Sequence, residues 1–188
     1  AVMQAARLIT HLGDQAAQKA AQPELNSRFD PPYTTIHVGT VEGGTALNIV
    51  ARNCAFKWEI RALPGDDPQD ILARFEAFCR DEVVPAMQRV VPETGVETRP
   101  GVIVPALAPE PDSAAEKLAR DLTGANATDA VSYATEGGQY QRAGIPAIVC
   151  GPGNIEQAHQ PNEWIALEQI AASQSFTRRL IAKCQADA

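Results

Sequence analysis

The change in hydrophobic period along the first third of the sequence limits the folds that this chain can adopt. Apolar residues over 2–22 recur at intervals of three and four, which predicts an amphipathic helix. Residues 34–41 are rich in strand formers, and apolar and charged residues alternate over 56–61, which predicts a strand with one buried face. Because Gly43-Gly44 suits a tight reversal between them, the two strands should pair antiparallel.

A second helix and one more strand complete this part of the sequence. After a turn at 63–68, apolar residues at helical spacing predict a helix that ends near Gln88 or Val91. Residues 94–104 predict a further strand. The order helix, strand, strand, helix, strand over 1–106 is that of a ferredoxin-like β-α-β-β-α-β domain without its first strand. Because the pattern is already helical at its start, we expect the chain to be cut from a longer one.

The remaining residues, 107–188, predict a smaller α/β unit that follows the proline-rich stretch 105–111. Helices and short apolar runs alternate at 113–122, 130–133, 145–150 and 167–183. This alternation indicates a parallel sheet, but two strands are too few to bury both faces of one. We therefore predict an α/β chain that consists of an incomplete α+β domain followed by a partial parallel α/β domain.

Composition excludes several classes of function. The net charge of −7 and the pI near 5.0 argue against nucleic-acid binding and against binding to an anionic membrane, since both need a basic patch. No apolar stretch approaches the roughly 18 residues of a membrane span, so we expect no membrane association and a cytoplasmic location. The four cysteines form no C-x-x-C pair, and we expect reduced, mostly buried thiols.

Common catalytic signatures are absent from the sequence: it has no H-E-x-x-H, no G-x-S-x-G, no P-loop and no dinucleotide-binding glycine motif. His159 follows the apolar run 145–150, and open α/β sheets place ligands and catalytic groups after their strands. Spacing alone favours a surface histidine or one that fixes the loop. Arg61, on the polar face of its strand, is by the same reasoning a solvated arginine or a carboxylate clamp.

Two segments carry a resemblance to a known family. Residues 33–61 contain Gly43-Gly44-Thr45, then Asn48, and end in Glu59-Ile60-Arg61. Residues 133–164 lead from Gly151-Pro152-Gly153 to Ala158-His159-Gln160-Pro161-Asn162-Glu163. In this order and spacing the motifs resemble the metal-dependent aminoacylase and carboxypeptidase family, which includes succinyl-diaminopimelate desuccinylase, and within it the acetylornithine deacetylase-like members.

The resemblance implies a catalytic α/β domain with two zinc ions, which cobalt or manganese could replace, interrupted by a ferredoxin-like lid through which two chains form a homodimer. Residues 1–106 would be the lid and residues 107–188 the C-terminal part of the catalytic domain. The implied substrate is a small N-acyl amino acid, with N-acetylornithine of arginine biosynthesis as the main candidate.

Residue by residue, the resemblance implies that His159 is a zinc ligand. Asn48 and Arg61 correspond to lid residues that hold the substrate. Thr135, Glu136 and Gly137 correspond to a turn that lines its pocket. Ala51 departs from the family, which commonly has proline there, and we expect only a change in loop stiffness.

The family's other metal ligands and its general base fall outside this sequence, so no catalytic residue is assigned. His11 and His37 are predicted to be structural. A catalytic zinc needs three protein ligands and a water, so we expect no hydrolase activity from this chain alone. Two alternatives stay open: a non-catalytic fragment that dimerises through its helix or edge strand, and a related peptidase or desuccinylase with another N-acyl amino acid as substrate.

Overall fold

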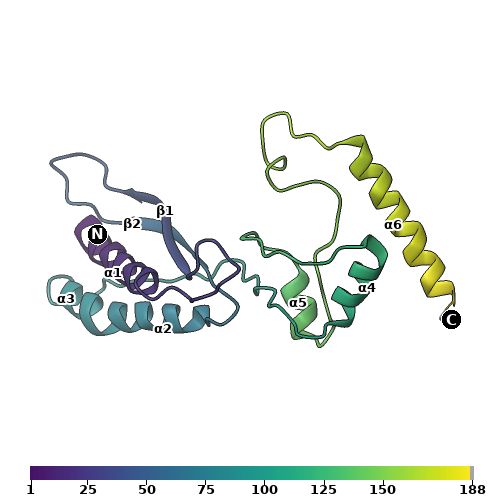
Figure 1. The fold of residues 1–188 in the computed structure, drawn as a ribbon. Coiled ribbons are helices and arrows are strands. Elements are labelled where there is room, and N and C mark those ends of the chain that lie inside the picture. Colours follow the sequence, from purple (N-terminus) through teal and green to yellow (C-terminus); the bar gives the residue numbers. More distant parts are fainter. Residues whose placement is uncertain (187–188) are drawn as a thin grey trace. The chain divides into compact units, whose positions relative to one another are not determined.

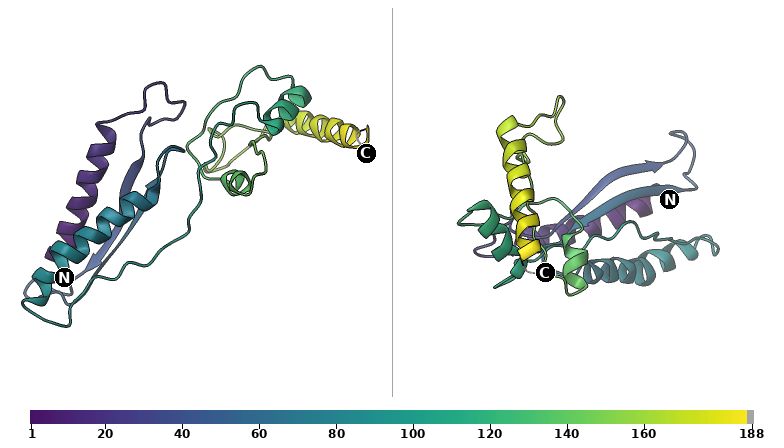
Figure 2. Two further views of the ribbon diagram at one scale, coloured as in Figure 1. Left: turned by 90° about the horizontal axis from the view of Figure 1, so that it is seen from below. Right: turned by 90° about the vertical axis from the view of Figure 1, so that its right-hand side faces the viewer.

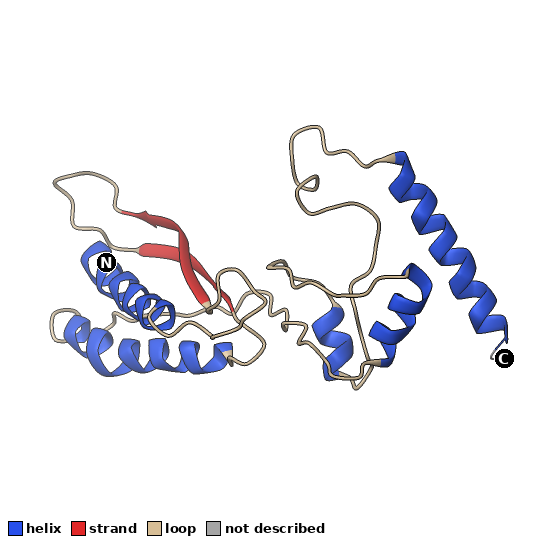
Figure 3. Ribbon diagram, in the orientation of Figure 1, coloured by secondary structure: helices blue, strands red, loops and turns tan. Residues whose placement is uncertain are grey.

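The computed structural model describes residues 1–186, and the contacts within the chain divide it into two compact units. The first unit consists of Ala1–Ala106 and Ala130–Ala134. The second consists of Leu107–Asp129 and the residues from Thr135 onward. Among residues 1–186, each unit contains helices, but strands occur only in the first (Figures 1 and 3). The predicted mixture of helix and strand is confirmed.

The elements of the first unit follow the predicted order: α1 (Val2–Ala20), β1 (Thr35–Gly43), β2 (Cys54–Arg61), α2 (Pro68–Phe78) and α3 (Val84–Gln88). The single helix expected between 68 and 88 is interrupted by a π-helical turn, Cys79–Val83, in which Val84 N–H donates to the Cys79 carbonyl five residues back. Pro85 supplies a local reason, because it has no N–H for the regular helical ladder.

The strands β1 and β2 pair antiparallel from Thr35 opposite Arg61 to Gly43 opposite Cys54, as predicted. They are the only strands that the structure describes, so each has an outer edge without a strand partner. Helices α1 and α2 lie on the same face of this hairpin (Figures 1 and 2). The hairpin therefore has one face covered by helices and one open face.

The core of the first unit lies between the hairpin and its helices. Five buried side chains form it: Leu8, Leu12, Phe75, Cys79 and Val83. The alternation in β2 directs Phe56 and Trp58 into this core, where their rings lie 6.3 Å and 5.1 Å from the ring of Phe75. The predicted period of two in β2 thus corresponds to real packing.

A partly buried polar cluster joins the end of α1 to the turn before α2. The Thr34 hydroxyl, which is 1% exposed, donates to the Asp66 carboxylate and accepts from Leu63 N–H at 2.9 Å. Lys19 Nζ lies 2.8 Å from the other Asp66 oxygen. Burial acts to raise the pKa of Asp66, but the hydrogen bonds from Lys19 and Thr34 and the charge of Lys19 outweigh it, so the pKa is lowered. Three chain segments are held together by this one carboxylate.

The prediction of a strand at 94–104 is wrong, because the structure shows no regular secondary structure over these residues. Val96 nevertheless packs against the core. In a split β-α-β arrangement, the strand after the helix is separated from the strand before it by another strand. The described residues provide none at that place, so the backbone of 94–104 has no ladder to join.

The second unit contains α4 (Ala114–Thr123), α5 (Gly137–Arg142) and α6 (Leu167–Ala186). The helices α4 and α6 match prediction, whereas α5 was not predicted. The apolar runs at 130–133 and 145–150 are not strands, so the predicted parallel sheet is wrong for the residues that the structure describes. Helices need only bonds within one segment, but strands need a neighbour, and these runs lack one.

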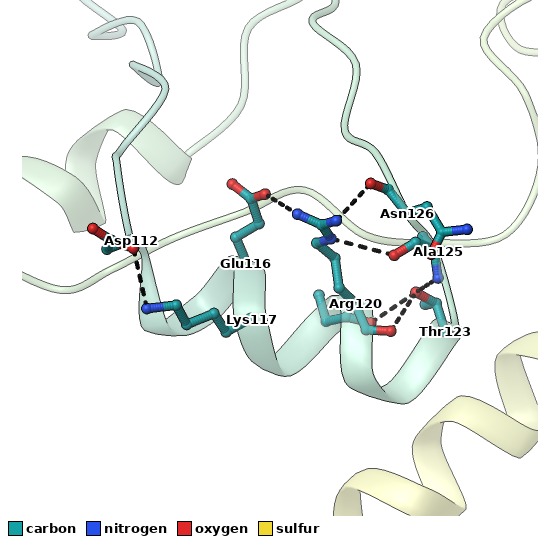
Figure 4. A network of polar contacts seen from close by, with 8 residues as sticks. Asp112, Glu116, Lys117, Arg120, Thr123, Ala125 and Asn126 are labelled. Carbon is teal, nitrogen blue, oxygen red and sulfur yellow. Dashed lines mark hydrogen bonds and ion pairs between the residues drawn. The ribbon is translucent and has the colours of Figure 1, made fainter.

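Helix α4 separates a polar side from an apolar side. On the polar side, Arg120 Nη1 lies 3.2 Å from Glu116 Oε1, and Lys117 Nζ lies 3.4 Å from Asp112 Oδ1 (Figure 4). Arg120 also donates to the carbonyls that follow the helix, beyond Gly124, whose φ of +78° ends it. The buried residues of the helix are Ala119 and Leu122.

All four cysteines are free thiols, as predicted. Cys79 is buried, and burial raises the pKa of its thiol. The expectation of burial is wrong for Cys150 and Cys184, which are exposed. Cys150 ends the apolar run 145–150 and Cys184 lies in α6, and no further layer within the described part of the chain covers either side chain. Within residues 1–186, no helix combines the length and the apolar character needed to cross a bilayer.

Candidate functional site

The loop that carries His159 is organised by a tight turn. Glu163 N–H donates to the Gln160 carbonyl at 3.1 Å, which closes a turn over Gln160-Pro161-Asn162-Glu163. Asn162 at its third position has a φ of +61°. Proline at the second position and asparagine with positive φ at the third are the signature of a type II β-turn. The order Pro-Asn in the sequence therefore determines the local path of the chain.

His159 itself stands in the left-handed region, with a φ of +58°. Its backbone N–H donates to Glu163 Oε2 at 3.0 Å, so the side chain of the turn's last residue closes a larger ring around the turn. The imidazole is exposed, and no hydrogen bond joins it to another residue within 1–186. Its ring nitrogens are thus free to bind an external ligand.

The described residues do not make up a metal site by themselves. Nowhere in residues 1–186 do three or more histidine, cysteine, aspartate or glutamate side chains gather in a way that could hold a metal ion. A catalytic zinc needs three protein ligands, and His159 offers one. The chemistry of this imidazole fits a zinc ligand, but the donor set within the chain is incomplete.

The turn Thr135-Glu136-Gly137 lies on the wall of a hollow of about 610 Å³ in the second unit. The remaining wall is apolar and comes from α4, α5, α6 and the run 145–150. Thr135 Oγ1 accepts from Gly137 N–H at 3.2 Å, which fixes the turn at the start of α5. The structure thus brings these three predicted residues together, in a hollow suited to aliphatic groups.

Asn48 and Arg61 both lie in the first unit, but at opposite ends of the hairpin. Asn48 is exposed in the loop between β1 and β2, beside the apolar start of α1. Arg61 is the last residue of β2 and pairs with Thr35 at the first position of β1. Eight residues of β2 separate the two ends, a length of roughly 25 Å. The two side chains therefore do not form one binding site within this unit.

Arg61 is partly engaged already. Its Nε lies 2.9 Å from Glu59 Oε1 on the same open face of β2, and the two side chains are 65% and 51% exposed. An exposed pair of this kind contributes little to stability. The rest of the guanidinium remains able to bind a carboxylate.

The other two histidines differ from one another. His11 stacks on Phe78 with ring centroids 4.2 Å apart, as expected of a structural residue. His37 is exposed on the open face of the hairpin, opposite Glu59. Within residues 1–186, no ring contact or buried position supports the predicted structural role for His37.

Comparison with known proteins places these features in a family. The family described as "Peptidase dimerisation domain" (M20_dimer) matches residues 1–87. This segment contains the hairpin, α1, α2 and the core cluster. It forms most of the first compact unit.

Three curated relatives are acetylornithine deacetylases. The protein of Myxococcus xanthus is 32% identical over 97% of this chain and 46% of its own length. The protein of Photorhabdus laumondii is 31% identical over 83% of this chain and 39% of its own length. The protein of Salmonella arizonae is 30% identical over 81% of this chain and 38% of its own length. The chain thus spans less than half the length of each.

Residues 1–87 are accordingly a peptidase dimerisation domain. Over most of its length the chain is similar to acetylornithine deacetylases. The resemblance predicted from the sequence is confirmed.

One feature of the His159 loop was not predicted: the contact between Glu163 and the His159 backbone. The Pro-Asn turn signal was present in the sequence and would have placed Glu163 back beside His159.

Proposed function

We propose that this chain is part of a metal-dependent amidohydrolase that removes the acyl group from an N-acyl amino acid. The observation that carries the proposal is His159: an exposed imidazole without a partner in the described residues, held in a left-handed backbone conformation. Such conformations are uncommon outside glycine and cluster at functional sites. Similarity to the acetylornithine deacetylases supports the reaction class.

The substrate proposed is N-acetylornithine, because the relatives are named for it. Its α-carboxylate needs a cationic partner, and the unengaged part of the Arg61 guanidinium provides one. Within the second unit, the hollow beside Thr135, Glu136 and Gly137 has apolar walls that suit an aliphatic group.

The metal proposed is zinc, with His159 as one ligand and with the remaining ligands and the general base supplied from outside these 188 residues. A bound zinc would supply a water that is activated for attack on the amide carbonyl. Because this donor set is incomplete, the chain alone is expected to be inactive.

The partner proposed is a second copy of the same protein, since residues 1–87 match a dimerisation domain. The same match favours a second candidate function for the isolated chain. A fragment with a dimerisation domain, and with no complete metal site in the part of the chain that the structure describes, would act as an interaction module.

Hydrolysis of N-acetylornithine with added zinc tests the choice between these functions. We expect turnover by the complete natural protein and none by the chain of 188 residues. Turnover by the chain itself, with stoichiometric zinc, would contradict the assignment of the missing ligands to other sequence.

Arg61 offers a sharper test with a matched control. Arg99 forms the same kind of exposed pair, with Nε 2.9 Å from Glu97 Oε1 two residues away. In the complete protein, Arg61→Ala should lower kcat/KM by about tenfold or more, mainly through KM, with zinc content unchanged. Arg99→Ala should leave both kcat/KM and the zinc content unchanged. Equal kinetics for the two variants would return Arg61 to a solvated surface residue.

A further inference from the structure

We propose that Glu163 is the positioning residue of His159, an inference that rests on the proposed role of His159 as a metal ligand. The Glu163 carboxylate accepts the His159 backbone N–H at 3.0 Å, and its own N–H donates to the Gln160 carbonyl at 3.1 Å. Glu163 thus holds the turn at two points. It touches the backbone of His159 and leaves the imidazole free.

The need for such a contact follows from the backbone of His159. A φ of +58° is disfavoured for a residue with a Cβ relative to the right-handed regions. Without a compensating contact, His159 would sample other conformations and carry its imidazole elsewhere. A hydrogen bond from an N–H to a carboxylate is among the stronger ones in proteins, and it is made only while His159 keeps this backbone conformation.

The rest of the turn makes the contact specific. Pro161 has no N–H, so it offers the Glu163 carboxylate no competing donor. Asn162 tolerates its own φ of +61° and returns the chain so that Glu163 faces His159. The turn residues Pro161, Asn162 and Glu163 therefore act together to fix the backbone from which the His159 side chain projects.

The consequence for ligand binding is preorganisation. When the backbone of a ligating residue is fixed beforehand, binding has to order only its side-chain torsions, and less conformational entropy is lost. Contacts that orient a metal ligand usually change metal affinity by about 10- to 100-fold when they are removed. The same range is expected for the Glu163 contact.

The experiment measures zinc affinity of the complete natural protein by competition with a chelator of known affinity. Glu163→Ala should weaken zinc binding by about 10- to 100-fold. Glu163→Gln keeps an acceptor oxygen and should stay within about threefold of the wild type. Glu156→Ala is the matched control. It removes an exposed glutamate of the same loop whose carboxylate makes no hydrogen bond within residues 1–186, and it should change nothing.

The outcomes separate this inference from the proposed function. If His159→Ala weakens zinc binding while Glu163→Ala behaves like Glu156→Ala, the positioning role is overturned and the ligand role stands. If His159→Ala has no effect on zinc, both are overturned. If Glu163→Gln is as weak as Glu163→Ala, the hydrogen-bond explanation is wrong.

A second pair of variants covers the case in which Glu163→Ala fails to fold. Asn162→Gly keeps the positive φ of the turn, whereas Asn162→Val opposes it. We expect normal zinc affinity for the first and weakened affinity for the second. Equal affinities in the two folded variants would overturn the role of the turn.

Discussion

The two units of this chain differ in how far they bury their apolar side chains. The first closes a core in which Leu12, Phe75 and Val83 are no more than 2% exposed. In the second, α6 has no buried residue within the part that the structure describes, and an apolar hollow remains beside it. Both units have amphipathic helices, so helix quality does not explain the difference.

The difference lies in what the helices pack against. In the first unit, α1 and α2 share the face of a paired hairpin, which supplies Phe56 and Trp58 to the core. In the second unit the apolar run 145–150 forms no strand, so its side chains stay at the wall of the hollow. In this chain, amphipathic helices bury their apolar side chains where they pack against a hydrogen-bonded sheet.

The largest expected contrast comes from the same substitution in each unit. Leu12→Ala removes a side chain that is 1% exposed and should lower the free energy of unfolding by about 3 kcal/mol. Leu180→Ala, on the wall of the hollow, should cost less than about 1 kcal/mol. Urea unfolding followed by circular dichroism measures both. Trp58 fluorescence in a Trp164→Phe background isolates the first unit, because Trp58 packs against its core. Equal losses would mean that the second unit is as well packed as the first.

The next test concerns acid stability, which should affect the first unit through Asp66. Folding lowers the pKa of Asp66 below its ordinary 3.8. The charged carboxylate therefore stabilises the folded state above about pH 4, and this contribution is lost as the pH falls through the lowered folded pKa.

Asp66→Asn is the variant that checks this pH dependence. It should lower the free energy of unfolding by about 1 kcal/mol at neutral pH, a modest value because the pair with Lys19 is 30% exposed. It should also flatten the acid dependence seen by Trp58 fluorescence. An unchanged acid profile in this variant would show that other carboxylates control the transition.

The smallest effects are expected from two glycines, one in each unit. Neither Gly13 nor Gly124 has an atom within 4 Å of an added Cβ, but Gly124 has a φ of +78° and Gly13 lies within α1. Gly124→Ala should therefore destabilise its unit by up to about 1 kcal/mol, whereas Gly13→Ala should stabilise α1 by about 0.5–1 kcal/mol. Thermal unfolding of each variant measures these two changes in stability. Effects of the same sign would rule out backbone conformation as the cause.

Helices were predicted well from the sequence because their hydrogen bonds are local. The period of 3.6 located α1, α4 and α6, and the alternation over 56–61 located β2. The π-helical turn at Cys79–Val83 was not predicted, since the apolar pattern continues through it. The segments 94–104 and 145–150 have strand composition but no partner, and pairing is a property of the whole sheet that no single segment encodes.

The candidate site was predictable in parts. Spacing identified His159 as a loop residue but did not separate a surface role from a ligand role. The structure adds two facts about His159: its positive φ and the hydrogen bond from its backbone N–H to Glu163. Sequence also grouped Asn48 with Arg61 by their implied role, whereas register places them at opposite ends of the hairpin.

The hairpin has one further consequence, for handling the protein. Both of its outer strand edges lack a strand partner within the residues that the structure describes, and unpaired edges are templates for strand addition. Concentrated samples of this chain should tend toward edge-to-edge oligomers and, on storage, toward aggregates. A lysine introduced at Thr40, an exposed position of β1, would be a practical way to keep preparations monodisperse.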